Sequence, residues 1–573
     1  MPAVLGVSAH YHDAAAALVI DGKLVAAQQE ERLSRVKNDP SLPMNAIEAC
    51  LTLGEIRSTD LDRVVFYENP YRKLERVMVS ALRGFPRGTA FFRRALRSQL
   101  GDKLWVLDDL AAHLGVPRKR MHFVDHHESH AASALFCAPF GDVPHSSIAA
   151  LTVDGVGEEE TTAIWRLEDG RPRRLASIAY PHSLGLFYAA VTAYCGFRVN
   201  EGEFKVMGLA AFGEPRYRDA FDHFLQVEGG AFTLDRAAFA DHLDGARAFG
   251  RPFVEALGEP RTPAQKWNYR GQRIQGEDAR FADVARSAQD ALEDALLTLA
   301  EHARALTGAT HLVLAGGVAL NSCANARLLR EGPFERVFVQ PAAGDAGGAL
   351  GAALLGAQDE GDALALGEPF CADLGVPIRP ATAAAIADAL GLRTTAVVDP
   401  NETLAARIAG GDVIALARGR CEFGPRALGH RSLLARADDE ALRDRINARI
   451  KKREPFRPFA PAMLESTAPA LLRDAPNDMT PYMTTVCRVR DRSPLQGTTH
   501  VDGTARAQTV QSGPLAPLLR CMESHGLHSV LNTSLNGPGE PLAATEADAI
   551  DVLIRHKPDG LLIDDLLIER PNR

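Results

Sequence analysis

Two histidines placed four residues apart could bind a metal ion together. His126 and His130 occur in the stretch VDHHESHAASA, and residues i and i+4 share one face of a helix. His127 and Glu128 would then point elsewhere, so we do not expect them to be ligands. The zinc-protease motif needs two residues between its Glu and its second His. This stretch has only one, which excludes that interpretation.

Two aspartates could complete such a site. Asp154 in TVDGVGE and Asp345 in PAAGDAGGALG each lie in a loop directly after an apolar strand, where a side chain projects into a cleft. Two histidines and two carboxylates suit Fe(II), Mn(II) or Zn(II). The residues alone leave a second interpretation open, in which the histidines only cap a helix or form hydrogen bonds.

The last third of the chain holds a second candidate site, which is built from cations. Twelve Arg or Lys residues lie between Arg418 and Arg457. The part DDEALRDRINARIKK mixes acidic and basic residues, as a solvated helix does. In EFGPRALGHRS and KKREPFRPFAP, glycine and proline restrict the backbone, and fixed cations suit bidentate contacts with phosphate. The candidate contacts are Arg426, Arg431, Lys451, Arg453 and Arg457.

Glycine-containing turns after strands offer further contacts for a nucleotide. The segment AGGVALNSCAN, with Gly316, Gly317 and Asn321, follows a buried strand and enters a helix. Its bare backbone N–H groups could therefore approach a phosphate. Later turns add polar groups that could bind phosphate or ribose, namely Thr504, Arg506, Asn532, Thr533, Ser534 and Asn536. Ordinary turn chemistry explains each of these features equally well when it is taken alone.

The elements that must position these residues include a repeated pattern. Residues 3–29 and 147–179 each read as strand, polar loop, strand, Asp-Gly turn and strand, and Asp-Gly suits a type I′ hairpin. The two polar loops carry His10, His12 and Asp13 in the first copy, and Asp154 and Glu158 in the second. The repeat predicts two similar subdomains that face a cleft, with two unrelated meanders as the alternative.

Length, composition and charge limit the class of protein. The 573 residues suffice for two or three domains, apolar residues recur with helical spacing over 285–306, and the polar stretch 357–368 suggests a boundary near 360–370. A net charge of −9 argues against general binding of nucleic acid or anionic membranes. We expect neither a signal peptide nor a membrane helix. The eight cysteines form no CxxC pair, so we expect a reduced cytoplasmic enzyme.

Ten segments, in this order along nearly the whole chain, resemble the nodulation-type O-carbamoyltransferases. They include VLGVSAHYHDAAAALVIDG, EERLSRVKND, VDHHESHAASA, AGGVALNSCANARL, GRCEFGPRALGHRSLLA and LNTSLNGPGEP. The resemblance implies an α/β fold with two parts. A duplicated actin-like (ASKHA-type) metal-binding domain would span residues 1–362, and a YrdC-like α/β domain would span residues 363–573.

The resemblance also implies an ATP-dependent O-carbamoyltransferase. Carbamoyl phosphate would yield carbamate, which would react with ATP in the C-terminal domain to give carbamoyl adenylate and pyrophosphate. The N-terminal domain would then transfer the carbamoyl group to a hydroxyl of a small-molecule natural product, such as an antibiotic or a sugar. The implied cofactors are ATP, carbamoyl phosphate as co-substrate, Fe(II) as the bound metal and Mg(II) with ATP.

The matching motifs imply roles for individual residues. The metal ligands would be His126, His130, Asp154 and Asp345, and the catalytic residues would be His12 and Lys37. His12 would act as general base, since histidine titrates near neutrality. The nucleotide and phosphate contacts would be Arg426, Lys451, Arg453, Arg457, Arg506, Asn532, Ser534 and Asn536, with Gly316, Gly317 and Asn321 as further candidates. Lys205 lies in a motif that departs from the family pattern, so it is a candidate only.

Two other functions compete with this one. A tRNA threonylcarbamoyladenosine-type enzyme would act on nucleic acid, which the acidic charge and the order of the domains argue against. An actin-like scaffold without transfer chemistry would leave the Arg-rich domain unexplained. We therefore expect a small-molecule hydroxyl acceptor, no nucleic acid and no membrane partner, and the resemblance is compatible with a homodimer. The segments Glu68–Leu107 and Phe239–Arg270 are expected to shape the acceptor pocket.

Overall fold

The computed structural model describes residues 2–84, 89–239, 248–364 and 366–571. Parts of the two segments predicted to shape the acceptor pocket, residues 85–88 and 240–247, lie outside the described residues. The chain divides into two compact units. We call residues 1–27 and 40–370 the N-terminal unit, and residues 28–39 and 371–573 the C-terminal unit. The short segment 28–39 thus belongs with the end of the chain.

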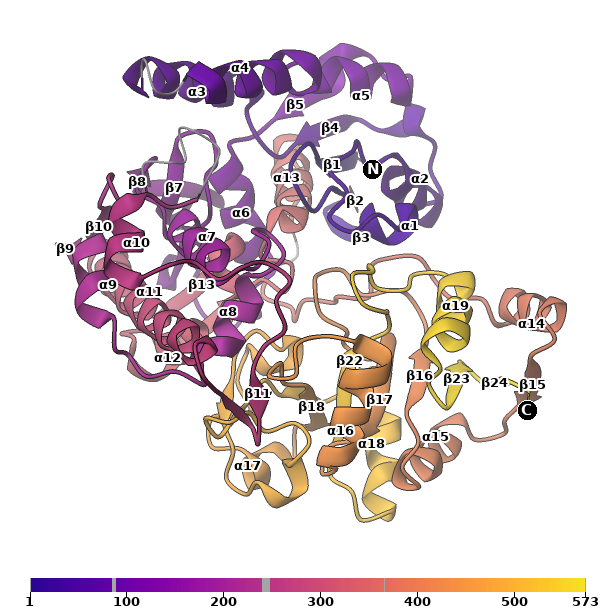
Figure 1. Cartoon of the computed structure of the whole chain (residues 1–573). Helices are drawn as coiled ribbons and strands as arrows, with labels where there is room; N and C mark the ends of the chain where they lie inside the picture. Colours follow the sequence, from indigo (N-terminus) through magenta and orange to yellow (C-terminus); the bar gives the residue numbers. More distant parts are fainter. Residues whose placement is uncertain (1, 85–88, 240–247, 365, 572–573) are drawn as a thin grey trace. The chain divides into compact units, whose positions relative to one another are not determined.

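The N-terminal unit contains two five-stranded sheets of the same topology (Figure 1). The first has the order β3-β2-β1-β4-β5, with β1 Ala3–Ser8, β2 Ala15–Ile20, β3 Lys23–Gln29, β4 Arg63–Phe66 and β5 Met121–Phe123. The second has the order β8-β7-β6-β13-β14, with β6 Ile148–Val153, β7 Glu160–Glu168, β8 Arg171–Ala179, β13 His311–Ala315 and β14 Arg336–Val339. In each sheet three antiparallel strands are followed by two parallel ones. The predicted duplication is confirmed.

The hairpin turns of the two copies explain why their registers match. Asp21 and Gly22 have φ values of 53° and 70°, and Asp169 and Gly170 have 52° and 77°. Positive φ at both central residues defines the type I′ turn, whose twist fits antiparallel strands. The Asp-Gly prediction is therefore confirmed in both copies.

Two helices connect the sheets, and each packs on the sheet that it does not follow. Helix α6 (His126–Leu135) comes after β5 but packs on the second sheet, and α13 (Asp345–Asp359) comes after β14 but packs on the first. The two helices also contact each other closely. A Cβ on Gly351 would lie 1.8 Å from the carbonyl oxygen of Ser129, so only glycine permits this approach. The start of α6 and the start of α13 are thereby held together.

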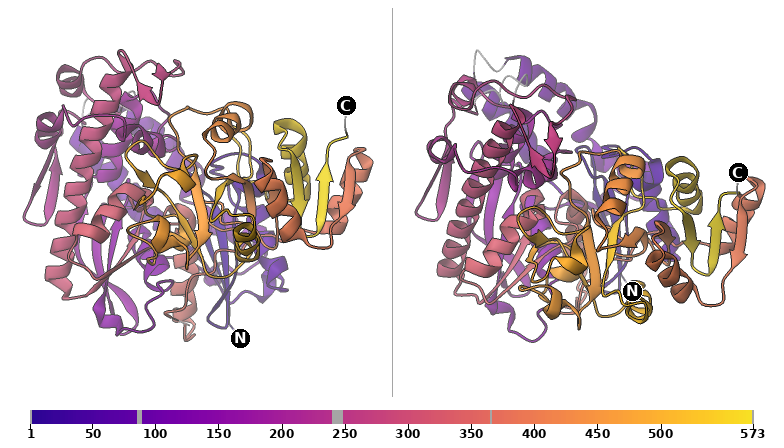
Figure 2. Two further views of the ribbon diagram at one scale, coloured as in Figure 1. Left: turned by 90° about the horizontal axis from the view of Figure 1, so that it is seen from below. Right: turned by 60° about the horizontal axis from the view of Figure 1, so that its bottom comes forward.

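Further helices and hairpins of the N-terminal unit accompany the two sheets and helices α6 and α13. The longest helix, α11 (Asp278–Thr307), confirms the helix predicted over 285–306 and packs against α7, α8, α9 and α12 (Figure 2). The remaining elements are α2 Met44–Leu53, α3 Pro70–Gly84, α4 Thr89–Ser98, α5 Val106–Leu114, α7 Leu184–Tyr194, α8 Glu203–Ala210, α9 Arg218–Phe224, α10 Arg251–Leu257 and α12 Ser322–Glu331, with the hairpins β9 Leu225–Glu228 and β10 Ala231–Leu234, and β11 Tyr269–Arg270 and β12 Arg273–Ile274.

The C-terminal unit is built on one eight-stranded mixed sheet of order β15-β24-β23-β16-β17-β22-β18-β21. Its strands are β15 Arg393–Ala396, β16 Ile414–Ala417, β17 Arg431–Arg436, β18 Ala460–Leu464, β21 Gln508–Val510, β22 Val530–Ser534, β23 Gly560–Ile563 and β24 Leu566–Glu569, and β19 Cys487–Arg488 pairs separately with β20 Thr504–Ala505. The helices are α1 Glu31–Ser34, α14 Pro380–Ala389, α15 Pro400–Ala409, α16 Glu440–Arg445, α17 Ala468–Leu471, α18 Leu515–Ser524 and α19 Glu546–His556.

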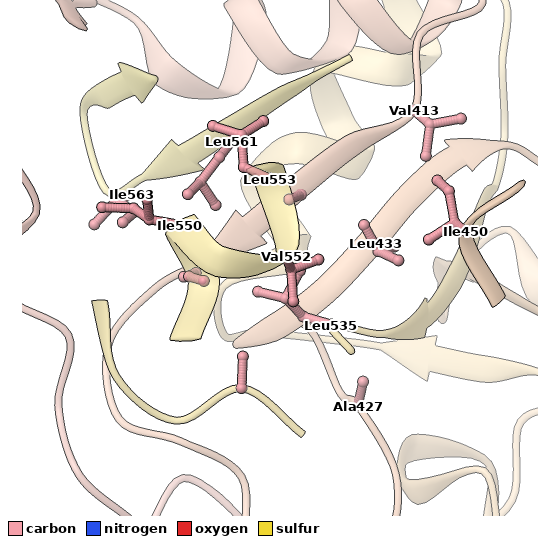
Figure 3. Close-up of a cluster of buried hydrophobic side chains, with 14 of the residues drawn as sticks. Val413, Ala427, Leu433, Ile450, Leu535, Ile550, Val552, Leu553, Leu561 and Ile563 are labelled. Carbon is pink, nitrogen blue, oxygen red and sulfur yellow. The ribbon is translucent and has the colours of Figure 1, made fainter. Parts of the chain in front are cut away.

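Apolar residues on both faces of this sheet give two cores. Leu433 of β17 and Leu561 of β23 pack with Leu553 and neighbouring residues of α19 (Figure 3). On the other face Leu434 and Leu416 pack with α15 and α18. Consecutive residues of one strand therefore point to opposite cores, as the alternation of side chains in a strand requires. Across the described ranges, no helix combines the length and the apolar character needed to cross a membrane.

Candidate metal centre and cation cluster

The four predicted metal ligands meet at one point in the N-terminal unit. His126 and His130 lie on the first turns of α6, Asp154 follows β6, and Asp345 begins α13. One ligand atom from each lies within 4.8 Å of all the others. The Nε2 atom of His126 is 2.9 Å from Asp154 Oδ2 and 3.1 Å from the Nε2 atom of His130. His130 Nε2 is 3.6 Å from Asp345 Oδ1.

The chemistry of these four side chains fits a divalent cation. All are buried or nearly so, and two imidazole nitrogens face each other beside two carboxylates. Burial opposes charge on Asp154, but hydrogen bonds from His126 and His130 lower its pKa well below the usual range. Burial likewise opposes protonation of His130, but Asp154 and Asp345 raise its pKa to about 9. Two nitrogen and two oxygen ligands of this kind suit a transition metal.

Each aspartate keeps one oxygen for this cluster because its other oxygen is already bound. The backbone N–H of Gly317 donates to Asp154 Oδ1 at 2.9 Å, and the hydroxyl of Tyr67 donates to Asp345 Oδ2 at 3.4 Å. Such contacts fix the orientation of metal-binding carboxylates. The sequence analysis missed Tyr67. The one feature of the sequence that could have indicated it is its position directly after the buried strand β4.

The residues beside the ligands have internal roles. Both ring nitrogens of His127 are occupied, at 2.8 Å from Thr152 Oγ1 and 3.0 Å from the carbonyl oxygen of Glu160. Burial and the neighbouring histidines lower the pKa of His127 to about 3. Glu158, which the sequence analysis noted without a role, accepts the backbone N–H of His126 at 3.0 Å. Its carboxylate thus lies at the positive end of α6.

The glycine turn after β13 contributes to the cluster through its backbone. Gly316 has a φ of 92°, and a Cβ there would lie 2.2 Å from the carbonyl oxygen of Val153. Gly317 is the residue that binds Asp154. Asn321 caps α12 by accepting the N–H of Ala324, and its amide exchanges two hydrogen bonds with Gln289. The side chain of Asn321 is therefore occupied within the protein.

His12 lies in the loop after β1, where the carboxylates of the cluster act on it. Its Nδ1 is 3.1 Å from Asp13 Oδ2, and a quarter of its side chain is exposed. Burial alone would lower the pKa of His12, but the hydrogen bond with Asp13 and the charges of Asp345 and Asp154 raise it to about 9. Lys37, the other predicted catalytic residue, lies in the segment that groups with the C-terminal unit.

Lys205, the remaining candidate of the N-terminal unit, lies on α8. Its ammonium is 5.5 Å from the centre of the Phe197 ring, a distance that suits a cation–π contact.

In the C-terminal unit, Lys451 ends a π-helical turn and is buried. Its ammonium donates to Asn536 Oδ1 at 2.7 Å and to the backbone and hydroxyl oxygens of Ser534 at 2.5 and 3.3 Å. The structure thereby brings together three of the predicted phosphate contacts. Burial lowers the pKa of Lys451 well below its usual range, and the charges of Arg453, Arg457 and Lys37 lower it further.

Four arginines complete this cation cluster, which we define as Arg426, Lys451, Arg453, Arg457 and Arg506. Burial lowers the pKa of Arg426 well below its usual range, with Arg506 and Arg457 adding repulsion. The buried Nε of Arg426 has no hydrogen-bond partner among the described residues. Arg453 stacks 4.1 Å from the centre of Phe459 and donates to Asn447 at 2.7 Å. Buried cations that repel one another need an anion to balance them.

The loop that carries Arg426 is held by two buried polar side chains. Glu422 accepts the backbone N–H groups of Leu428, His430 and Arg431 at 2.8 to 3.0 Å. Asn532 donates to the carbonyl oxygen of Ala427 at 3.1 Å. Asn532, predicted as a ligand contact, therefore also positions this loop.

The prediction that Arg431 contacts phosphate is wrong. Its side chain is completely buried, and its guanidinium donates to the carbonyl oxygens of Ala544, Arg418 and Val376 at 2.8 to 3.2 Å. The sequence pattern alone suggested that the Arg431 guanidinium was free to bind a ligand. In the structure, backbone carbonyl groups bind it instead. Arg431 holds loops of the unit together.

Two family models match the chain. The model described as the carbamoyltransferase N-terminus matches residues 3–354, and the model described as the carbamoyltransferase C-terminus matches residues 405–570. An uncharacterised protein of Synechocystis is 38% identical over all of this chain and 97% of its own length. Nodulation protein NolNO of Sinorhizobium fredii is 35% identical, over 98% of this chain and 79% of that protein.

More distant relatives carry an activity in their names. The 3'-hydroxymethylcephem-O-carbamoyltransferase of Amycolatopsis lactamdurans is 28% identical over 94% of each chain. Among solved structures, T. kodakarensis HypF is 16% identical over 63% of this chain and 48% of that one, with a TM-score of 0.32. The two family models cover most of the chain and contain both clusters. The chain belongs to the carbamoyltransferase family.

Proposed function

We propose that this protein is an ATP-dependent O-carbamoyltransferase that acts on a hydroxyl group of a small molecule. The observation that carries the proposal is the cation cluster of the C-terminal unit, whose buried charges call for a polyanion such as ATP with carbamoyl phosphate. The O-carbamoyltransferase activity named for the cephem relatives supports a hydroxyl acceptor. We also propose that this unit has the YrdC-like fold that the family resemblance implies.

The first half-reaction would use the cation cluster. Water cleaves carbamoyl phosphate to carbamate and phosphate, and a carbamate oxygen then attacks the α-phosphorus of ATP. The bond from the α-phosphorus to the bridging oxygen breaks, carbamoyl adenylate forms, and pyrophosphate leaves with Mg(II). Arg426, Lys451 and Arg457 would offset the charge that develops on the leaving group. Ser534 and Asn536 hold the ammonium of Lys451 in place for this task.

The four-residue cluster of the N-terminal unit would hold Fe(II). When bound, a divalent metal supplies Lewis-acid polarisation of an oxygen on the carbamoyl donor. The protein's own contribution is orientation, since Gly317 and Tyr67 turn the two carboxylates so that Asp154 and Asp345 each present one oxygen.

His12 would accept the proton of the acceptor hydroxyl. As the hydroxyl oxygen attacks the carbamoyl carbon, the bond from that carbon to the phosphate oxygen breaks and AMP leaves. Asp13 holds Nδ1 of His12 at 3.1 Å, so Nε2 can take the proton. The raised pKa of His12 comes partly from Asp345 and Asp154, and it falls when their charges are neutralised.

Pyrophosphate release from ATP tests the proposal. We expect release only when carbamoyl phosphate is present, and carbamoylated product when a panel of hydroxyl compounds is added. His12→Ala should keep the release of pyrophosphate and lower transfer by about 10²- to 10⁴-fold, whereas the exposed His113→Ala should change neither. Release without carbamoyl phosphate would overturn the proposal, and a product formed only on RNA would favour the tRNA-modifying alternative.

A further inference from the structure

Three cations lie together on one side of the candidate metal centre. Lys73 and Arg76 are three residues apart on α3, so they share a face of that helix. Lys103 ends a π-helical turn, Gln99–Lys103, that packs against α3. The charges of Lys73, Glu68, Arg76 and Asp345 all act on Lys103. The charge of a proposed metal ligand therefore reaches this group, and the mechanism above does not use these cations.

A shared carboxylate ties α3 to the metal centre. Oxygen Oε1 of Glu158 accepts the backbone N–H of Asn69 at 2.6 Å and that of His126 at 3.0 Å. Asn69 in turn accepts the N–H groups of Tyr71 and Arg72 through its side chain, and so caps α3. The start of α3 and the start of α6 are thus fixed to the same oxygen atom, which places the first turns of α3 beside the metal ligands.

The charges of this group do not balance within the protein. Lys73 pairs with Glu68 at 2.5 Å, and both side chains are buried. Arg76 and Lys103 form no ion pair with any described carboxylate, and the buried Nε of Arg76 has no hydrogen-bond partner there. Arg76 lies 5.4 Å from the centre of the Tyr180 ring. Among the described residues Glu68 is thus the carboxylate that forms an ion pair with this group, whereas Glu158 and Asp345 act on it through their charges without an ion pair. Such an arrangement costs free energy unless an anion binds.

We propose that Arg76 and Lys103 bind an anionic oxygen group, a carboxylate or a phosphate, of a substrate that reacts at the metal centre. The inference rests on the proposed function, because it deepens the account of that site. The planar guanidinium of Arg76 suits two-point contact with such a group, and Lys103 adds a point charge. The group belongs either to the acceptor or to the phosphate of the carbamoyl donor. Burial lowers the pKa of Lys103 to about 8, and a bound anion would restore it.

Binding of inorganic phosphate to the full-length protein tests this proposal. The measurement uses the Arg426→Ala background, so that the cation cluster of the other unit contributes less. Adding Arg76→Gln and Lys103→Gln together should weaken phosphate binding at least about tenfold, since each substitution removes a charged contact with the anion. The exposed Arg93→Gln, which lies on the neighbouring helix α4, should leave it unchanged. Arg76→Lys keeps the charge and should weaken binding by less than the Gln variant.

Competition with AMP identifies the source of the anion. If AMP displaces phosphate, the group is the phosphate of the donor, and if phosphate binds alongside saturating AMP, the group belongs to the acceptor. Absence of phosphate binding in the background protein, or equal binding after both substitutions, overturns the proposal. Circular dichroism confirms that each variant is folded. Pyrophosphate release with intact Arg426 tests the proposed function separately, so the two can fail independently.

Discussion

The two clusters of this protein have opposite charge imbalances. In the N-terminal unit, two carboxylates and two imidazoles converge within 4.8 Å, and a cation would balance them. In the C-terminal unit, four arginines and Lys451 repel one another, and the nearby acid Glu454 lies 3.5 Å from Arg457. There an anion would balance them. Each unit therefore has a site whose excess charge a ligand would offset, and the two ligands would have opposite sign.

The two clusters also differ in how they are held. The metal cluster uses short side chains at the starts of α6 and α13 and at the end of β6, so regular structure places the ligand atoms directly. The cation cluster uses long side chains from separate segments, since Arg426 lies on a loop that Glu422 and Asn532 hold by hydrogen bonds and Lys451 ends a π-helical turn. We infer that the first site depends on helix packing, whereas the second depends on a few buried polar contacts and tolerates removal of a cation without loss of folding.

Among the changes that compare the two clusters, the largest effect is expected for Arg426→Ala. Loss of one charge that stabilises a leaving group lowers rates by about 10²- to 10³-fold, so carbamoyl-phosphate-dependent release of pyrophosphate should fall by that factor. The melting temperature should rise, because removal of Arg426 relieves repulsion among buried cations. The exposed Arg520→Ala is the control. Normal release of pyrophosphate from the Arg426 variant would show that the cation cluster does not bind the reacting nucleotide.

Asp154→Asn should impair the metal cluster and leave the cation cluster intact. The amide keeps an acceptor for the N–H of Gly317 but removes a charged ligand, so affinity for Fe(II) should fall at least about 100-fold, beyond the effect of losing an outer contact. Metal analysis after dialysis measures this, and Asp142→Asn, an exposed aspartate, is the control. Pyrophosphate release should stay within about twofold of wild type. Retention of metal would rule out Asp154 as a ligand.

Local patterns were enough to predict the repeated sheets and the helical pair of histidines. The Asp-Gly turns and the i, i+4 spacing of His126 and His130 act over a few residues. The meeting of Asp154 with Asp345 could not be derived in this way. It depends on how closely α6 and α13 approach each other, which Gly351 permits. Their position after apolar strands made both aspartates candidates, and the family resemblance assigned them to one site with the histidines.

Contacts between distant segments explain what the sequence analysis missed or misread. Arg431 looked like a phosphate contact because its charge is visible in the sequence, whereas the carbonyls of Val376, Arg418 and Ala544 that bind it are not. For the same reason Tyr67 was missed and Glu158 was noted without a role. The role of each is set by a partner on another element, Asp345 for one and the start of α6 for the other.

Arg431→Lys tests whether this arginine stabilises the fold, in contrast to Arg426, which we expect to contact the ligand. Lysine keeps the charge but cannot donate to several carbonyls at once, so the free energy of unfolding should fall by about 2 kcal/mol. Thermal or urea unfolding measures the change. Arg445→Lys, a surface residue paired with Asp559 at 2.8 Å, should alter stability by less than 0.5 kcal/mol or so, as is usual for exposed pairs. A large loss of pyrophosphate release without loss of stability would instead place Arg431 among the ligand contacts.

The smallest effect is expected for Tyr67→Phe, which asks whether the metal cluster depends on its hydrogen bonds as the cation cluster does. Phenylalanine keeps the ring that packs 5.2 Å from the His126 ring but removes the hydroxyl bound to Asp345. Because that contact is long, at 3.4 Å, metal affinity should fall by only about three- to tenfold, at or below the low end of the range for such contacts. Titration against a chelator measures it, with Tyr188→Phe, which removes a buried hydroxyl bound to Gln289, as control. An unchanged affinity would mean that the start of α13 alone orients Asp345. A loss above 100-fold would mean that hydrogen bonds, and not helix packing, hold the metal cluster in place, as they do for the cation cluster.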